Sequence, residues 1–351
     1  MRFGALFLAV LLAAVLWGAF WHREAGHAED GIREGGARLA ALGFLFEEDD
    51  IEILGFPYRL QAVITSPRLS DGNSRPGMTL RADRIDLVTH PWTPGHYVVK
   101  GEQLRLGFSK LVLRAPEIRA SHVETGAGRQ IDIDFGPVSI DFPATDGVAL
   151  RAARMQIHLR LPDREAMDGS DGDGLYGPER AEISIKLTRL GLGPFTSSAP
   201  APEIASLAMR AELHGSLPLP LDADSLAAWR DAGGTLDLGM IEADWDRWHI
   251  AASGSLALDD ELRPLGAMTL RTDAGPALLD WFADRGLIRR EALGPARILL
   301  ARLSEDAQEA TIELPLMLQD GEIMLAALSL AELVPLLKPR GASREGSRAP
   351  R

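Results

Sequence analysis

The amino-acid sequence predicts a mainly β fold: a β-rich α+β protein of elongated antiparallel sheets, with a few short helices and one N-terminal transmembrane helix. Three observations predict it. Residues 3–20 carry no charged side chain, apolar and polar residues alternate with a period of two after residue 51, and only a few segments show helix-capping signals. We therefore expect a β-rich body held next to a membrane.

The apolar run at residues 3–20 has the length of a short membrane span, which needs roughly 17–25 residues. It is either a cleaved secretory signal or a retained signal-anchor. The run is longer than the apolar part of a typical signal, and its end is rich in bulky Trp17, Phe20 and Trp21 rather than small residues. Tryptophan also favours the membrane–water interface. These features favour a retained anchor at residues 1–23.

The distribution of charge favours a body outside the cytoplasm. Of the net charge of −13, the tail at residues 338–351 contributes +4 and Arg2 and Arg23 contribute +2, so residues 24–337 carry −19. An acidic body argues against binding nucleic acid and against lying flat on anionic lipid. The chain has no cysteine, which excludes disulfides and thiol catalysis and suits an oxidising compartment. We expect a single-pass protein of the inner membrane with its body in the periplasm.

After the anchor, residues 24–50 are expected to form a stalk, and residues 24–42 within it have the pattern of a weak helix. From residue 51 the apolar side chains alternate with polar ones, as in strands with one buried face and one wet face. The segments 148–161 and 182–192 are the clearest pair and are expected to form a long hairpin. The alternating apolar residues are Met155, Ile157, Leu159 and Leu161; Ile183, Ile185 and Leu187; Leu207, Met209, Ala211 and Leu213; Leu236, Leu238 and Met240; Leu256 and Leu258; Met268 and Leu270; and Ile312, Leu314, Leu316 and Leu318.

Composition predicts how the body is divided. Residues 191–202 are rich in Gly, Pro, Ser and Ala and are expected to link an N-terminal β-rich domain at 51–190 to a C-terminal one at 203–337. The tail at 338–351 has almost no apolar residue and is expected to be disordered. Helices are predicted at residues 222–232, at 273–285 with an Asp cap, at 288–304 with a break near Pro295, and at 330–337.

Several short segments, in a fixed order, resemble the domain-of-unknown-function family numbered 2125 of alphaproteobacteria. The first is the run from Gly55 to Leu60, GFPYRL. The later segments contain Trp229, Gly233-Gly234, Trp245 and Trp248, then GSLALD at 254–259, LRPLG at 262–266, LPL at 314–316 and DGEI at 320–323. Together they cover nearly the whole chain after the anchor.

The resemblance implies a membrane-anchored, envelope-facing protein and supplies no reaction and no catalytic residue. The family pattern leads us to expect a Gly near Ala326 or Ala327, where this chain has Ala, which puts the geometry of that turn in doubt. The strand-turn-strand segments are also similar to those of other anchored β-rich envelope proteins, including the AsmA-like ones.

The best candidates for site chemistry lie between residues 244 and 249, where Asp244, Asp246 and His249 are interleaved with two Trp residues. Asp244 and Asp246 would share a strand face, and carboxylates with a His can bind a metal if they converge. A hairpin turn whose Trp side chains pack over a sheet edge explains the same residues more simply. No cofactor, metal or catalytic residue is assigned.

Two other segments contain residues that can bind a metal. The acidic loop with Asp168, Asp171 and Asp173 places Leu175 and Tyr176 where a calcium loop needs a ligand and a Gly, which favours a solvated hairpin loop. His90 and His96 flank a Pro/Gly loop that has no evident third ligand. Motifs for nucleotide binding, zinc proteolysis and serine hydrolysis are absent from the sequence.

The expected function is that of a non-enzymatic envelope protein that binds a lipid or another apolar ligand in a β groove. The alternative is a structural or interaction module whose sheets are fully packed and whose acidic surface meets an envelope protein. The expected partners are therefore the membrane, through the N-terminal helix, and either a lipid or an envelope protein, but not nucleic acid.

Overall fold

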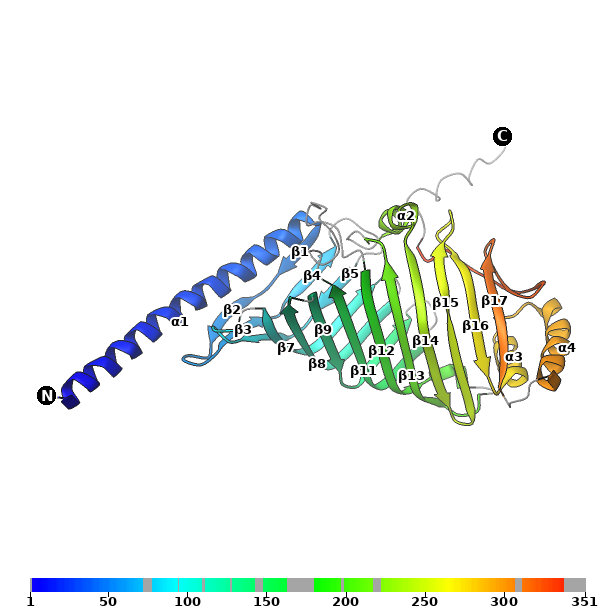
Figure 1. Cartoon of the computed structure of the whole chain (residues 1–351), viewed down its shortest axis with the longest axis horizontal. Helices are drawn as coiled ribbons and strands as arrows, with labels where there is room; N and C mark the ends of the chain where they lie inside the picture. The colour runs from blue at the N-terminus through cyan, green and yellow to red at the C-terminus, as the bar shows by residue number, and fades with distance from the viewer. Residues whose placement is uncertain are drawn as a thin grey trace, which may run out of the picture. The chain divides into compact units, whose positions relative to one another are not determined.

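The structure is a computed structural model that describes residues 2–71, 78–93, 95–108, 111–126, 128–142, 148–162, 180–196, 199–216, 222–306 and 311–337. Side chains at 2–6, 9, 148–149, 194–195 and 304–306 are also outside the description. The acidic loop around Asp171 and the basic tail at 338–351 lie outside these ranges. The described chain is mainly β, and the strand pairings given below are all antiparallel (Figure 1).

The chain divides into two compact units, Met1–Gly147 and Val148–Arg351. This division differs from the linker expected at residues 191–202. Strands β12 (Arg180–Gly191) and β13 (Glu203–His214) are hydrogen-bonded neighbours, so the Gly- and Pro-rich segment only connects two strands of one sheet. Its composition reflects a turn that contains the short 3₁₀ helix η3 (Gly193–Thr196).

Unit 1 begins with one long helix, α1 (Arg2–Ala41), which includes both the apolar run and most of the expected stalk. Over the residues that the structure describes, no helix combines the length and the apolar character needed to cross a membrane. The second half of α1 contacts the sheet through Trp21 and Ala25, which form a buried cluster with Leu60. Gly31, Gly35 and Gly36 lie in the segment predicted as a weak helix and do not interrupt α1.

The sheet of unit 1 is built around a long hairpin of β7 and β8. The outer edge of β7 is shared by two shorter strands, β6 and β5, and the outer edge of β8 by β9 and β10. From β6 the sheet continues to β3 and β2, and from β5 to β4 and β1. The strands are β1 (Phe44–Glu47), β2 (Asp50–Leu54), β3 (Leu60–Thr65), β4 (Arg68–Asp71), β5 (Met78–Arg81), β6 (Arg84–Thr89), β7 (His96–Phe108), β8 (Leu111–Thr125), β9 (Gly128–Phe135) and β10 (Val138–Phe142).

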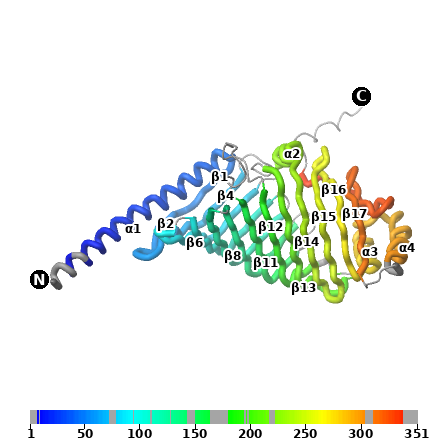
Figure 2. Tube along the Cα trace, viewed as in Figure 1, coloured from blue at the N-terminus to red at the C-terminus, as the bar shows by residue number. Residues whose placement is uncertain are grey.

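Over its described residues, unit 2 is a nine-stranded meander in which each strand pairs with the next along the chain (Figure 2). The predicted hairpin is confirmed, since β11 and β12 pair with His158 opposite Ser184. The remaining strands agree with the alternating segments of the sequence. The strands not yet given are β11 (Val148–Pro162), β14 (Thr235–Trp245), β15 (Trp248–Leu258), β16 (Pro264–Thr272), β17 (Ile312–Gln319), β18 (Glu322–Leu325) and β19 (Leu328–Glu332).

The register of unit 2 places apolar side chains of successive strands on one face. One row crosses the sheet from β11 to β17: Ile157, Ile185, Met209, Ile241, Ala252, Leu270 and Leu314. The neighbouring row on the opposite face is polar or small, with Gln156, Lys186 and Ala208. Burial differs along the apolar row, because Ile185 is half-buried whereas Leu314 is buried.

Two predicted helices of unit 2 are confirmed, with one correction to a cap. Helix α2 (Ala223–Asp231) is capped by Asp222, whose carboxylate accepts a hydrogen bond of 2.9 Å from the backbone N–H of Ser225. Helix α3 (Gly275–Ala283) has no side-chain cap. Asp273, the predicted cap, instead accepts a hydrogen bond of 2.9 Å from the backbone N–H of His249.

Two further helix predictions are wrong in part or in whole. Helix α4 (Arg290–Asp306) is not broken near Pro295: the proline lies inside the helix, in its second turn, and the helix continues through it. No helix forms at residues 330–337: Leu330 belongs to strand β19, and Ala331 pairs with Ile323 of β18. Pairing with β18 satisfies the backbone of this short apolar segment, which a periodicity argument cannot distinguish from a helix.

Candidate functional site

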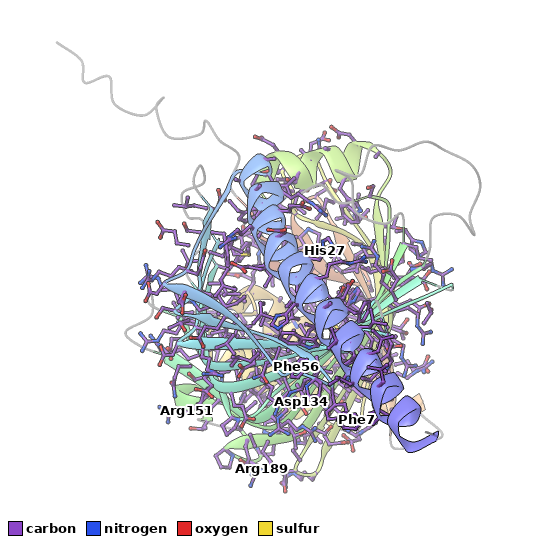
Figure 3. The ribbon with its side chains drawn as sticks, turned by 90° about the vertical axis from the view of Figure 1, so that its left-hand side faces the viewer. Phe7, His27, Phe56, Asp134, Arg151 and Arg189 are labelled. Atoms are coloured by element: carbon purple, nitrogen blue, oxygen red, sulfur yellow. The ribbon has the colours of Figure 1, made fainter. Side chains whose placement is uncertain are left out.

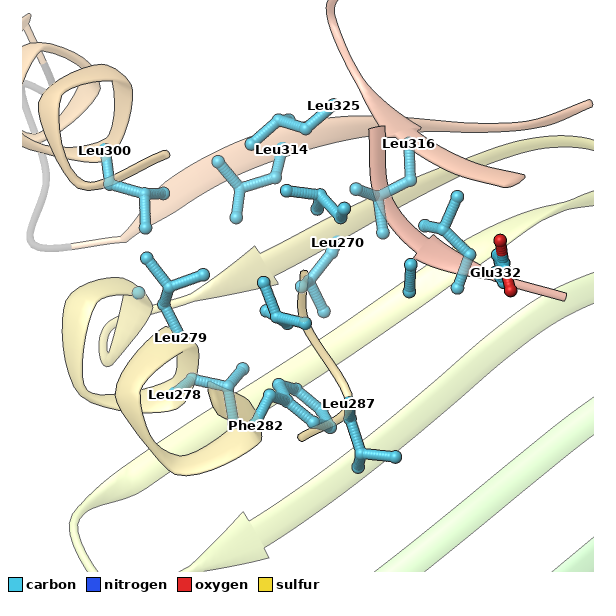
Figure 4. Close-up of a pocket in the computed structure, with 15 residues that line it drawn as sticks. Leu270, Leu278, Leu279, Phe282, Leu287, Leu300, Leu314, Leu316, Leu325 and Glu332 are labelled. Carbon is cyan, nitrogen blue, oxygen red and sulfur yellow. The ribbon is translucent and has the colours of Figure 1, made fainter. Parts of the chain in front are cut away.

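The most distinctive feature of unit 2 is an apolar pocket of about 400 Å³ near the C-terminal end of its meander (Figure 4). It lies between strands β16 to β19 and helices α3 and α4. Among the fifteen lining residues that the structure describes, only Glu332 is charged. The others are Leu270, Gly275, Leu278, Leu279, Phe282, Leu287, Ile288, Leu300, Leu314, Leu316, Ile323, Leu325, Leu330 and Ala331.

The turn from β16 into α3 brings the helix close to the sheet. Thr272 is fully buried, and its hydroxyl accepts a hydrogen bond of 3.1 Å from the backbone N–H of Ala274. At Gly275 a Cβ atom would lie 2.2 Å from Cδ1 of Ile312 on β17. Glycine is therefore the residue that lets the first turn of α3 contact the strand, with Leu278 and Leu279 directed into the pocket.

Helix α4 closes another side of the pocket with a face of small and apolar side chains. Ala292, Ala296 and Leu300 recur every four residues and are almost completely buried, in one cluster with Ile312 and Leu314. This spacing places them on one side of the helix. On the exposed side, Arg297 pairs with Asp280 of α3 at 2.7 Å, which joins the two helices.

A polar network lies beside the apolar wall, where the loop from α3 to α4 meets β18 and β19. The guanidinium of Arg289 pairs with Glu322 at 2.8 Å and with Glu332 at 2.9 Å, and it donates a hydrogen bond of 2.9 Å to Ser329. Its backbone N–H also bonds to the carbonyl of Leu330 at 2.8 Å. Burial lowers the pKa of Arg289, but hydrogen bonds and charge from Glu322 and Glu332 raise it more, so the group remains protonated.

This arrangement has the features of a site for an apolar chain with a polar end. Ligand pockets typically enclose roughly 300–1,000 Å³, are mostly apolar and carry a few polar groups that fix orientation. The fourteen uncharged lining residues offer neither a metal ligand nor an acid–base pair. Such a lining is suited to binding an apolar group.

The structure places the predicted residues Asp244, Asp246 and His249 at the β14–β15 turn. Asp244 and His249 face each other across the two strands, with Oδ1 and Nδ1 separated by 2.9 Å. Asp246 lies in the turn itself with a φ of 54°. The expected hairpin turn is confirmed, and Trp245 and Trp248 are buried together with Leu278 of α3, whereas the Asp244–His249 pair is exposed. Both strands have neighbours on each side, so the two Trp side chains do not lie over a sheet edge as expected.

Among the residues that the structure describes, no group of three or more His, Asp or Glu side chains could hold a metal ion. His90 forms a stacked contact with Trp92, with ring centroids 5.1 Å apart. Its partner in the motif, His96, begins β7, and its backbone carbonyl accepts a hydrogen bond of 2.8 Å from the hydroxyl of Thr89. Residues 168–174, the calcium-like loop, lie outside the described chain.

Sequence reasoning did not identify the pocket. Leu270, Leu314 and Leu316 were recognised as apolar positions of strands, and residues 273–285 as a helix. The pocket depends on how α3 is placed on the sheet. That placement is set by the close approach of Gly275 to Ile312, two residues 37 positions apart. No local pattern records such a distant contact.

The sequence matches the family of uncharacterised proteins conserved in bacteria, DUF2125, over residues 21–333. No curated protein and no solved structure gave a match. The matched range includes most of both units and all of the residues that line the pocket. The chain therefore belongs to domain-of-unknown-function family 2125, as its order of short motifs indicates.

Proposed function

We propose that this protein is a membrane-anchored, non-enzymatic protein of the bacterial cell envelope that holds a lipid acyl chain, or a similar apolar ligand, in the pocket of unit 2. The observation that carries the proposal is a pocket of about 400 Å³ with a single charged residue in its lining. Each CH₂ group moved from water into such a site contributes roughly 0.8 kcal/mol. An alkyl chain is the ligand that gains most from a wall of leucines.

The polar network around Arg289 supports a ligand with one polar end. Glu332 lines the pocket and its side chain is 77% exposed, so it lies where the apolar wall meets solvent. A headgroup that donates hydrogen bonds can reach this carboxylate while its chain remains inside. Glu322 and Glu332 together outnumber Arg289, which favours a neutral or cationic headgroup over an anionic one.

The anchoring part of the proposal depends on residues 3–20 and on how α1 presents them. Phe7, Leu8, Leu11, Leu12 and Leu16 are each at least half exposed, although they are large apolar side chains. Such a surface is costly in water and favourable in a bilayer. With the acidic body and the absence of cysteine, it supports a single-pass inner-membrane protein whose body lies in the periplasm.

The alternative, an interaction module with fully packed sheets, is less well supported. Ile157, Ile185 and Met209 on the apolar face of unit 2 are only half-buried, so that face is not closed in the way the alternative requires. Its acidic surface remains compatible with a protein partner.

A cysteine-protection experiment tests ligand binding, because the natural chain has no cysteine. Ala331 lines the pocket, whereas Ala267 on β16 of the same sheet is exposed and is not one of its lining residues. In the full chain in phosphatidylcholine vesicles, we expect monolaurin, whose glycerol headgroup is neutral and donates hydrogen bonds, to slow maleimide labelling of Ala331→Cys by about tenfold and to leave Ala267→Cys unchanged. Equal effects on both variants, or none on either, would contradict the proposal.

A further inference from the structure

Unit 1 carries a group of aromatic rings, most of them exposed, beside the end of the apolar run of α1. We define this aromatic collar as Trp17, Phe20, Phe56, Tyr58 and Trp92. It comes from three segments: α1, the loop between β2 and β3, and the loop between β6 and β7. The rings of Trp17 and Phe20 are 5.4 Å apart, and those of Trp17 and Trp92 are 6.0 Å apart.

Specific hydrogen bonds hold the loop of residues 55–59 against the helix. The indole N–H of Trp17 donates to the carbonyl of Pro57 at 2.9 Å, and that of Trp21 donates to the carbonyl of Arg59 at 3.0 Å. Gly55 has a φ of 103°, and a Cβ there would lie 2.7 Å from the carbonyl oxygen of Arg59. The loop conformation therefore depends on glycine, and the same loop packs Phe56 against Trp21 with ring centroids 5.4 Å apart.

The second loop is attached to the first. His90 Nδ1 lies 3.2 Å from the carbonyl oxygen of Tyr58, and the ring of His90 stacks on Trp92. The three segments thus form one connected surface, although they are up to 75 residues apart in the chain. Figure 3 labels Phe56 beside α1, with Phe7 nearer the N-terminus of the helix.

Four of these rings are exposed, and Trp17 is half-buried between them and the loop. Phe56 is 55% exposed, Tyr58 73% and Trp92 56%. Contiguous exposed apolar surface of this kind marks an interaction site. Trp and Tyr are enriched where a bilayer meets water, because their rings are apolar and their N–H and O–H groups are polar.

The position of the collar along α1 favours a membrane over a protein as the partner of these rings. The run from residue 3 to residue 20 would extend about 27 Å as a helix, close to the roughly 30 Å of a hydrocarbon core. The collar is at the C-terminal end of that run, where the headgroups would lie. Exposed Arg23 and Arg59 follow directly and match the charge of lipid phosphates.

We infer that the aromatic collar lies in the interfacial layer of the bilayer, so that three segments of unit 1, and not α1 alone, fix the protein at the membrane surface. This inference rests on the anchoring part of the proposed function. It adds a second attachment, the loops that carry Phe56, Tyr58 and Trp92, which α1 positions through the hydrogen bonds from Trp17 and Trp21.

Depth-dependent quenching of a fluorophore on single cysteines tests the inference in the full chain, reconstituted in vesicles of phosphatidylcholine and phosphatidylglycerol. Tyr58→Cys reports the collar, Leu16→Cys reports the apolar run, and Asp83→Cys is the control. Asp83 is exposed and directly precedes the first residue of β6. Trp92 of the collar follows the last residue of β6, about 20 Å away along the strand.

With lipids spin-labelled near the headgroup, we expect quenching at Tyr58→Cys at least about twofold stronger than at Asp83→Cys. Quenching at Leu16→Cys but not at Tyr58→Cys would contradict the inference that the collar contacts the membrane, while still supporting insertion of the apolar run. Absence of quenching at both positions would overturn the anchor and the collar together. Tyr58 is the most exposed ring of the collar, so its replacement removes little packing.

Discussion

The two ends of the meander in unit 2 have the same alternating sequence pattern but different surroundings. Ile185 of β12 and Ile312 of β17 are both isoleucines on the apolar face, yet the first is half-buried and the second is 5% exposed. Helices α3 and α4 account for the difference, since they cover the β16–β19 end and enclose the pocket. The comparison shows that alternation determines which face of a strand is apolar, whereas the helices determine where that face becomes a binding site.

The largest expected effect comes from truncating matched residues at the two ends. Ile312→Ala should lower the free energy of unfolding by about 2–5 kcal/mol, because it removes buried methyl groups and leaves a cavity. Ile185→Ala should cost only about 1 kcal/mol, because that side chain still contacts solvent. Urea unfolding of the full chain in detergent micelles, followed by tryptophan fluorescence, measures both. Equal losses would show that the two ends are packed alike.

A second pair of variants tests how closely α3 must approach the sheet. Gly275→Ala places a Cβ within 2.2 Å of Ile312 Cδ1 and should destabilise the protein by roughly 1–3 kcal/mol. Gly294→Ala in α4 has no neighbour within 4 Å and should stabilise it by about 0.5–1 kcal/mol. Thermal unfolding distinguishes the two signs. A neutral Gly275→Ala variant would mean that α3 is not held against β17.

A pH series tests the turn between β15 and β16, which lies between the two ends. Burial raises the pKa of Asp259, but hydrogen bonds from the backbone of Arg263 and Glu261 and the side chain of Arg263 lower it below its ordinary value of 3.8. A carboxyl with a depressed folded-state pKa stabilises the fold above its unfolded pKa, and this contribution disappears as the pH falls through the folded value.

We therefore expect Asp259→Asn to lower the melting temperature at pH 7, by the equivalent of about 1 kcal/mol. The difference from the natural chain should shrink as the pH falls below 3.8. Asp260→Asn, at the exposed neighbouring position, serves as the control. A difference that stays constant with pH would assign the effect to something other than the charge of Asp259.

The smallest effect is expected at the β14–β15 turn. Asp244 and His249 are both mostly exposed, and exposed ion pairs contribute little to stability. His249→Ala should leave the melting temperature unchanged, and zinc should not raise the melting temperature of the natural chain. A zinc-dependent increase that is lost in His249→Ala would instead make this turn a metal site.

Much of the sheet could be predicted from the sequence, because strand alternation is a local property. The hairpin of β11 and β12 and the Asp222 cap of α2 follow from neighbouring residues. The segment after Leu330 was predicted as a helix because a short apolar run is compatible with either structure. Its pairing with β18 could only be recognised from the structure.

The pocket and the aromatic collar could not be predicted for the same physical reason. Each depends on contacts between segments far apart in the chain, such as Gly275 with Ile312 or Trp17 with Trp92. The residues 244–249 attracted attention because their charges are adjacent in sequence. In the structure Asp244 and His249 lie exposed beside a turn. The pocket is instead enclosed by apolar residues that are far apart in the sequence.

The most direct test of the central claim is photoaffinity labelling of the full chain in vesicles that contain phosphatidylcholine with a diazirine on its acyl chain. Peptide mapping should find labels on α3 and on strands β18 and β19, in addition to those on the apolar run at residues 3–20. Replacing Ala331 with Phe should remove the labels from α3 and the strands and leave those on the run. Labels confined to the run and the aromatic collar in the natural chain would contradict lipid binding in the pocket.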